Sequence, residues 1–195
     1  MTLRTLMAHQ VQRLPFVARL QDRRRRHQAA RLDAQASALQ LVTLRSESVR
    51  GNFIFPGLSI QLEVVHQGQR VGTVEYGLSA LNDRLYISDF KIRDPHRRQG
   101  LGQAALWALH RQHGVPLATL HEVGTSLDFW SKIERRFAAA GVHLQRDIRT
   151  GEQAEEMARW AHLIPESEAE RSIREYWAWV AAEHAAGRPA GPGIR

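Results

Sequence analysis

The feature that most constrains the fold is a change of hydrophobic period close to residue 95. Before it, apolar and polar residues alternate over residues 58–66, 70–78 and 84–92, and turn residues separate these segments. Such alternation indicates half-buried β-strands. After it, apolar residues recur at helical spacing from residue 101 to Gly114. Three consecutive strands with short turns form an antiparallel meander, so the sequence predicts a sheet at the core and not a helix bundle.

The remaining elements complete an α/β order. The pattern predicts strands over 115–123 and 142–148, and helices over 126–140, 152–163 and 166–186. Upstream lies a polar helix over 16–39, followed by a weak candidate strand over 39–45. We therefore expect a mixed, mainly antiparallel sheet flanked by helices. The expected divisions are a basic helical N-terminal arm over 1–50, a core over 51–150, and C-terminal helices with a flexible tail over 151–195.

The charge of the chain is basic and is carried almost wholly by arginine. The formal net charge is +7, and Lys91 and Lys132 are the only lysines. This balance favours anionic partners, such as nucleic acid, an acidic protein or a phosphorylated cofactor. The run Arg23, Arg24, Arg25 and Arg26 lies within the polar helix. Two interpretations stay open for it, a solvated helix face and an arm that binds nucleic acid.

Several classes of site are excluded by what the sequence lacks. The chain has no cysteine, which rules out a disulfide framework and a thiol nucleophile. No apolar run approaches the roughly 20 residues that cross a bilayer, and polar residues interrupt the first 20 positions. We expect a cytoplasmic protein without a membrane partner. His110 and His113 lie three residues apart on a predicted helix, and we expect surface histidines there and no metal site.

The segment most informative about chemistry runs from Phe90 to Leu109, where a strand enters a loop and the loop opens into a helix. Gly100 and Gly102 stand at the start of that helix, so a ligand can approach the backbone without meeting a Cβ. The N–H groups of a first helical turn and the helix dipole attract anions. Arg97 and Arg98 add full positive charges. The segment predicts a site for a pyrophosphate, although neither the dinucleotide fingerprint nor the P-loop pattern fits.

The run Arg97-Arg98-Gln99-Gly100-Leu101-Gly102 resembles the signature Arg/Gln-x-x-Gly-x-Gly/Ala of the GNAT superfamily of N-acetyltransferases. The strand order over 58–148 is similar to that fold as well. The resemblance implies acetyl-CoA as co-substrate, no metal, and a sheet in which one pair of strands splays apart. The cofactor-binding residues it implies are Phe90, Lys91, Ile92, Arg97, Arg98, Gln99, Gly100, Leu101, Gly102 and Gln103.

The resemblance also implies a division of labour around the cofactor. Loop amides would bind the pyrophosphate of CoA, the strand end 90–92 would pair with its pantetheine arm, and the strand 117–123 would splay away. An amine of a protein or small molecule would attack the acetyl carbonyl directly, assisted by a base and an acid. A backbone N–H near Ile92 would polarise that carbonyl.

Alternation along the strand predicts that Tyr86, Ser88, Phe90 and Ile92 share one face, with Asp89 on the other. Positions that match Tyr86 and Ser88 often hold the base or its water in similar enzymes, so both are candidate catalytic residues. The other two candidate catalytic residues are His121 and Glu122, on the splayed strand.

The family's usual acid is missing from this chain. The position of its tyrosine falls on Phe137, or on Trp130 in a second frame, and neither side chain can protonate a thiolate. The alternative function is therefore a catalytically degenerate module that binds CoA, or binds nucleic acid through its basic surface. Trp160, Trp177 and Trp179 in the C-terminal helices are expected as core or interface anchors, and these helices would allow a homodimer.

Overall fold

The computed structural model describes residues 15–188, with side chains from residue 18. It divides into two compact units, residues 1–161 and 162–195. The first unit holds the sheet and most of the helices, whereas the second is built around one helix. Within residues 15–188, no helix combines the length and the apolar character needed to cross a membrane.

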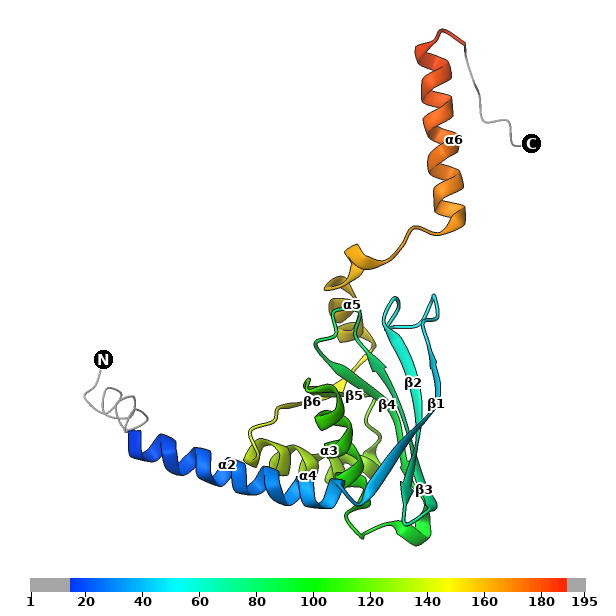
Figure 1. Ribbon diagram of the computed structural model, residues 1–195. Coiled ribbons are helices and arrows are strands. Elements are labelled where there is room, and N and C mark those ends of the chain that lie inside the picture. The colour runs from blue at the N-terminus through cyan, green and yellow to red at the C-terminus, as the bar shows by residue number, and fades with distance from the viewer. Residues whose placement is uncertain (1–14, 189–195) are drawn as a thin grey trace. The chain divides into compact units, whose positions relative to one another are not determined.

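The first unit is organised on a six-stranded sheet whose strand order follows the chain (Figure 1). The strands are β1 (Leu39–Glu47), β2 (Leu58–His66), β3 (Gln69–Leu78), β4 (Leu85–Ile92), β5 (Leu117–Leu120) and β6 (Leu144–Ile148). The first four pair antiparallel, and β4, β5 and β6 pair parallel. This confirms the predicted α/β class and the mixed, mainly antiparallel sheet.

One face of the sheet carries the main core, which three helices cover: α2 (Pro15–Ala36), α3 (Leu101–His113) and α4 (Leu127–Ala139). Gly100 and Gly114 bound α3 with left-handed backbone, at φ 79° and 70°. Glycine adopts this conformation without the Cβ penalty, which is why the helix begins and ends at these two positions. Gly100 is thereby placed at the end of the loop that follows β4.

A second core cluster contains Tyr86 and Trp160, both fully buried. Trp160 follows α5 (Thr150–Ala158), and its indole N–H donates to the Phe55 carbonyl oxygen at 3.1 Å. Short 3-10 turns occur at Asp94–His96, Gly124–Ser126 and Ala161–Leu163. In the second unit, α6 (Glu168–Ala185) begins at a capping box between Ser167 and Glu170.

The structure departs from the sequence expectations at four places. Residues 39–47 form a complete strand paired to β2, so this part of the expected arm belongs to the sheet. The strand expected over 115–123 is only Leu117–Leu120, because His121 has left-handed backbone at φ 48°. The helix expected over 152–163 is α5, which ends at Ala158. Of the three tryptophans expected as core or interface anchors, Trp160 is a core residue, and Trp177 and Trp179 are exposed.

Candidate active site

The sheet opens between β4 and β5. Their pairing runs from Leu85–Leu117 to Ile87–Thr119 and goes no further, although β4 continues to Ile92. The left-handed turn at His121 takes the chain away from β4. The expected splayed pair of strands is therefore present, and the second half of β4 offers its main chain to a ligand on that side.

A first cavity of about 860 Å³, here called the loop cavity, lies against this half of β4 and the start of α3. It is also lined by residues from Val123 to Arg136, which belong to α4 and the turn before it. The structure brings nine of the ten predicted cofactor-binding residues to its wall: Phe90, Lys91, Ile92, Arg97, Arg98, Gly100, Leu101, Gly102 and Gln103. Gln99 is the exception, since its amide donates to the Pro95 carbonyl oxygen at 3.1 Å.

The loop cavity is electropositive. The N–H groups at the first turn of α3 have no partner within the helix, and no side chain among the described residues caps them at Gly100. The cationic side chains in the wall are Lys91, Arg97, Arg98, Lys132 and Arg136, and the carboxylate there is Asp128. Full positive charges therefore line the cavity, and the helix dipole adds to them at the start of α3, as in sites that bind phosphate.

Arg97 also holds the loop in shape. Its Nε donates to the Ile92 carbonyl oxygen at 2.9 Å, and its guanidinium lies 2.6 Å from the Asp94 carboxylate. Arg98, at φ 63°, is exposed and lines the cavity. We infer that Arg97 mainly orients the loop and that Arg98 is the more accessible charge for an anion.

Gly102 faces two aromatic rings. A Cβ at this position would lie 3.3 Å from ring atoms of both Phe90 and Phe129. The two rings stack at a centroid distance of 5.7 Å. The absence of a side chain at Gly102 thus lets the start of the helix pack closely against these rings, which belong to the wall of the loop cavity.

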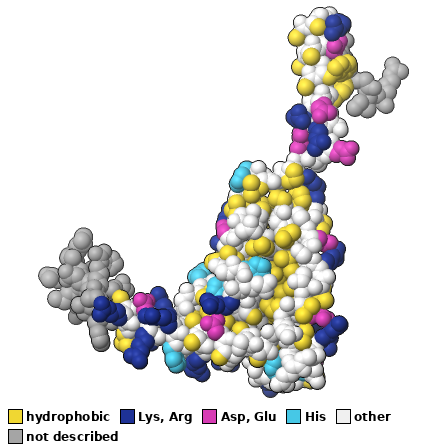
Figure 2. Space-filling view, viewed as in Figure 1, with side chains coloured by type: hydrophobic (Ala, Val, Ile, Leu, Met, Phe, Trp, Pro, Cys, Tyr) yellow, Lys and Arg dark blue, Asp and Glu magenta, His cyan; other side chains and the backbone are white. Residues whose placement is uncertain are grey.

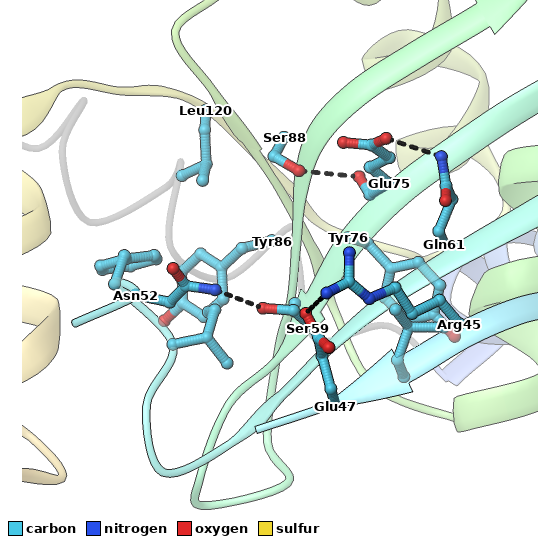
Figure 3. A pocket seen from close by; sticks show the side chains of 14 residues that line it. Arg45, Glu47, Asn52, Ser59, Gln61, Glu75, Tyr76, Tyr86, Ser88 and Leu120 are labelled. Atoms are coloured by element: carbon cyan, nitrogen blue, oxygen red, sulfur yellow. Dashed lines mark hydrogen bonds and ion pairs between the residues drawn. The ribbon is translucent and has the colours of Figure 1, made fainter. Parts of the chain in front are cut away.

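A second cavity of about 310 Å³, here called the sheet cavity, lies over the strands β1 to β4 (Figure 3). Its wall combines apolar side chains with polar ones, and the polar ones include Arg45, Glu47, Asn52, Ser59, Gln61, Glu75 and Ser88. Along β4, Ser88 lines the sheet cavity and Phe90 lines the loop cavity. At the end of β5, Leu120 lines the sheet cavity, and Val123, three residues later, lines the loop cavity. Residues two apart in a strand lie about 7 Å from each other, so the linings of the two cavities come close together along β4.

The prediction that Tyr86, Ser88, Phe90 and Ile92 share one face is wrong. Pairing along β3 passes from Glu75–Asp89 to Tyr76–Ile87, which leaves Ser88 as an extra residue in a β-bulge. A bulge breaks the alternation of side chains. Tyr86 accordingly packs in the second core cluster, whereas Ile87 and Phe90 both pack with the main core. The same shift places Asp89 on the face of Tyr86.

Tyr86 lines the sheet cavity, and its hydroxyl is fixed in a polar network. Its hydroxyl donates to Glu156 at 2.5 Å, and the Glu156 carboxylate also pairs with Arg84 and Arg159, each at 2.7 Å. Burial, and then the hydrogen bond to Glu156, raise the pKa of the Tyr86 phenol. Tyr86 therefore stays protonated and acts as a structural donor in this conformation. Ser88 donates to the Glu75 carbonyl oxygen at 3.1 Å and remains exposed.

The structure brings neither Glu122 nor His121 to the two cavities. The Glu122 side chain is 1% exposed and lies 2.5 Å from Arg146. Its carboxylate also accepts from the Thr119 hydroxyl at 2.6 Å. This carboxylate closes a buried ion pair and faces neither cavity. His121 is exposed, and its Nε2 lies 2.8 Å from the Gln153 amide.

The positions that match the family's tyrosine are occupied by core residues. Phe137 is fully buried and Trp130 nearly so, and both belong to the main core. Trp130 reaches Phe90 and Phe129 at centroid distances of 6.0 and 5.0 Å. The sequence analysis missed Glu75, which lines the sheet cavity, because a strand carboxylate of this kind has no motif around it.

Comparison with known proteins gives limited similarity. No family model matches the chain, and no curated protein is significantly similar to it. Among solved structures, it resembles an aminoglycoside acetyltransferase from an uncultured soil metagenomic sample, in complex with trehalose, at 15% identity and a TM-score of 0.31. That match covers 40% of this chain and 55% of the other, so the chain spans about half of the other's length.

A nourseothricin acetyltransferase is similar at 19% identity and a TM-score of 0.31, with 52% of this chain and 76% of the other covered. At such values neither superposition assigns a family or a function to this chain.

Proposed function

We propose that the protein is an acetyl-CoA-dependent N-acyltransferase that transfers an acetyl group to an amine. The observation that carries the proposal is that two cavities have neighbouring linings along β4, beside the opening of the sheet. The loop cavity has the charge and the free amides for a pyrophosphate, and the sheet cavity can receive an acceptor. The resemblance of residues 97–102 to the GNAT signature supports the same assignment.

The residues present fit the parts of CoA. Amides of the first α3 turn, with Arg98, would hold the pyrophosphate, while Lys132 and Arg136 remain in the wall for a further phosphate. The edge of β4 that faces away from β3, which has no strand partner from Ser88 to Ile92, would hydrogen-bond the amide groups of the pantetheine arm. An extended arm placed along this strand leads from the loop cavity to the opening.

In the reaction, the residues of the chain would orient the thioester and the acceptor and would provide polar groups around them. An N–H of β4 beside the bulge would donate to the thioester carbonyl and stabilise negative charge on its oxygen. Ser88 would hold a water or the acceptor at the opening, and Tyr86 fixes the wall beneath it. With Phe137 and Trp130 in the core, the leaving thiolate would take its proton from solvent or from the attacking nitrogen.

Calorimetric titration of the protein with acetyl-CoA tests the site, with Gly100→Glu as the disrupting variant. The structure offers a matched control in Gly114→Glu, because both glycines are left-handed caps of α3 with no atom within 4 Å of a Cβ. The two positions are about 20 Å apart along the helix. We expect binding to be lost in Gly100→Glu and kept in Gly114→Glu. Equal binding by both variants, or none by the wild type, would reject the site.

A second candidate function, nucleic-acid binding, is favoured by the exposed half of α2. Arg23, Arg24, Arg25 and Arg26 are all exposed, and Figure 2 shows cationic side chains gathered over this helix. Replacing the four arginines by glutamine should weaken binding to duplex DNA or RNA. The salt slope should fall by about one for each phosphate that an arginine no longer neutralises. Unchanged binding and slope in a filter or fluorescence assay would remove α2 from this function.

A further inference from the structure

The two lysines of the chain lie at the same cavity. Of 27 lysine and arginine residues, only Lys91 and Lys132 are lysines, and both line the loop cavity. An arginine stays charged under all ordinary conditions, whereas a lysine can lose its proton and attack a carbonyl carbon. The cavity proposed to hold a thioester is therefore the place where the chain has its only side-chain amines.

The register of β4 determines the face of the sheet from which Lys91 projects. After the bulge, the pairing of β4 with β3 is continuous, so side chains alternate between the two faces. Phe90 packs with the main core, and Lys91 therefore projects from the opposite face. Glu75, which pairs with Asp89, is also on that face and lines the sheet cavity, as Figure 3 shows. Lys91 thus stands on the face of the sheet cavity while it lines the loop cavity.

An acceptor amine has to meet the same two conditions, because it approaches from the sheet cavity and reacts with a thioester held from the loop cavity. In the proposed function, the thioester carbonyl lies beside the bulge at Ser88. Asp89, the residue after the bulge, is about 7 Å from Lys91 along the strand. The flexible four-carbon stem of a lysine spans a comparable distance. The Lys91 amine can therefore reach the position of the thioester carbon.

The Lys91 side chain is not fixed by another charge. It is exposed, and across residues 15–188 neither lysine forms an ion pair with a carboxylate. Arg97, in contrast, is held by Asp94 at 2.6 Å. Reorienting the Lys91 side chain toward a bound thioester therefore breaks no ion pair.

We propose that Lys91 is a self-acetylation site, at which the protein transfers the acetyl group of bound acetyl-CoA to the Nζ atom of its own side chain. This inference rests on the proposed function, because the bound thioester is the donor. Lys132 is not the acceptor, since it lies on α4, which covers the other face of the sheet. Acetylation removes a positive charge from the wall of the loop cavity, so the modified protein binds CoA more weakly.

The atoms and electrons of the transfer balance. The Lys91 ammonium first releases one proton to solvent. The nitrogen lone pair then forms the C–N bond at the acetyl carbonyl, and the C–S bond breaks with its electron pair on sulfur. The second proton leaves the nitrogen and reaches the thiolate through water, which yields acetyllysine and the free thiol of CoA. Because donor and acceptor are held in one molecule, the step is effectively unimolecular.

The test incubates the full chain with acetyl-CoA without any other amine. Intact-mass measurement and peptide mapping locate the acetyl group, and Lys132 of the same molecule serves as an internal comparison. The variants are Lys91→Arg, Gly100→Glu and the control Gly114→Glu. S-Acetyl-N-acetylcysteamine, a thioester without the nucleotide part of CoA, measures the intrinsic reactivity of each lysine. Circular dichroism with thermal melting checks that each variant is folded, and calorimetry measures acetyl-CoA binding separately.

We expect one acetyl group at residue 91, none at that position in Lys91→Arg, and a rate per molecule that does not change with protein concentration. The rate should be at least tenfold lower in Gly100→Glu than in Gly114→Glu, and at least tenfold lower with the short thioester than with acetyl-CoA. Lys91→Gln, which has the neutral charge of acetyllysine, should raise Kd for CoA about two- to fivefold relative to Lys91→Arg.

Three results would overturn the inference: equal acetylation of Lys91 and Lys132, equal rates in folded Gly100→Glu and Gly114→Glu, or equal rates with the two thioesters. Acetyl-CoA binding without acetylation of Lys91 also overturns it, and leaves the proposed function standing. If calorimetry shows no binding of acetyl-CoA, the proposed function and the self-acetylation site are both rejected.

Discussion

Replacing Glu122 by alanine should destabilise the protein strongly while leaving acetyl-CoA binding intact. The Glu122 carboxylate is buried and accepts from Arg146 through Nε at 3.0 Å and through Nη2 at 2.5 Å, with a third bond from Thr119. The variant leaves the guanidinium of Arg146, only 20% exposed, without its main partner. Breaking one side of a buried ion pair costs about 3–5 kcal/mol. We expect the lower end, because Arg146 keeps the Ser131 hydroxyl at 2.7 Å.

The assay is urea denaturation followed by circular dichroism, with a thermal melt as a second measure. A loss of about 3 kcal/mol corresponds to a fall in Tm of roughly 6–12 °C in a domain of this size. Arg146 also supplies the matched control, since its second carboxylate partner, Glu134, is 47% exposed and lies at 3.3 Å. An exposed pair contributes about 0–1 kcal/mol, so Glu134→Ala should change little.

Equal effects of Glu122→Ala and Glu134→Ala would refute the reasoning, because Glu122 is buried and accepts two bonds from Arg146, whereas Glu134 is exposed and accepts one at 3.3 Å. A folded Glu122→Ala variant with normal stability but no turnover would contradict it in another way. That result would return Glu122 to the catalytic candidates.

Three further changes test other parts of the first unit. Asp33→Ala removes the acceptor of the buried Trp107 indole N–H, at 2.8 Å, and should cost about 1–3 kcal/mol by urea denaturation. Burial alone would raise the pKa of Glu156, but hydrogen bonds from Tyr86 and Arg159 and the nearby arginine charges outweigh it and hold that pKa below its ordinary value. The stability from this lowered pKa is present above the unfolded value of about 4.3 and is lost as pH falls through the folded pKa. The free energy of unfolding of Glu156→Gln should therefore fall less steeply with decreasing pH in this range than that of the wild type. Identical pH profiles for the two proteins would contradict the assignment. Gly102→Leu places a side chain against Phe129 and should lower acetyl-CoA affinity more than tenfold by calorimetry, whereas Gly151→Leu, with open space at its Cβ, should not.

The local pattern of the sequence was sufficient to predict three strands, the helix α3 and the residues that line the loop cavity. Alternation predicted β2, β3 and β4 to within about one residue, and the glycines at positions 100 and 114 predicted both ends of α3. Segments of this kind depend on side-chain period and on backbone freedom at single residues, which a sequence displays directly. The cofactor-site residues lie close together in the chain for the same reason, and the structure gathers nine of the ten around one cavity.

Only the tertiary structure decided the acceptor side. The bulge at Ser88 places Asp89 on the same face of the sheet as Tyr86. A bulge of this kind arises from the pairing of β4 with β3, which the sequence of one strand does not show. Arg146, which holds the Glu122 carboxylate, lies 24 positions away in the sequence. The residues Arg45, Gln61, Glu75 and Asp89, which pair across the sheet, come from four different strands. Such residues come together through strand pairing between distant parts of the chain. The pairing is stabilised by the sheet as a whole, so the spacing of residues in the sequence does not reveal which residues will meet.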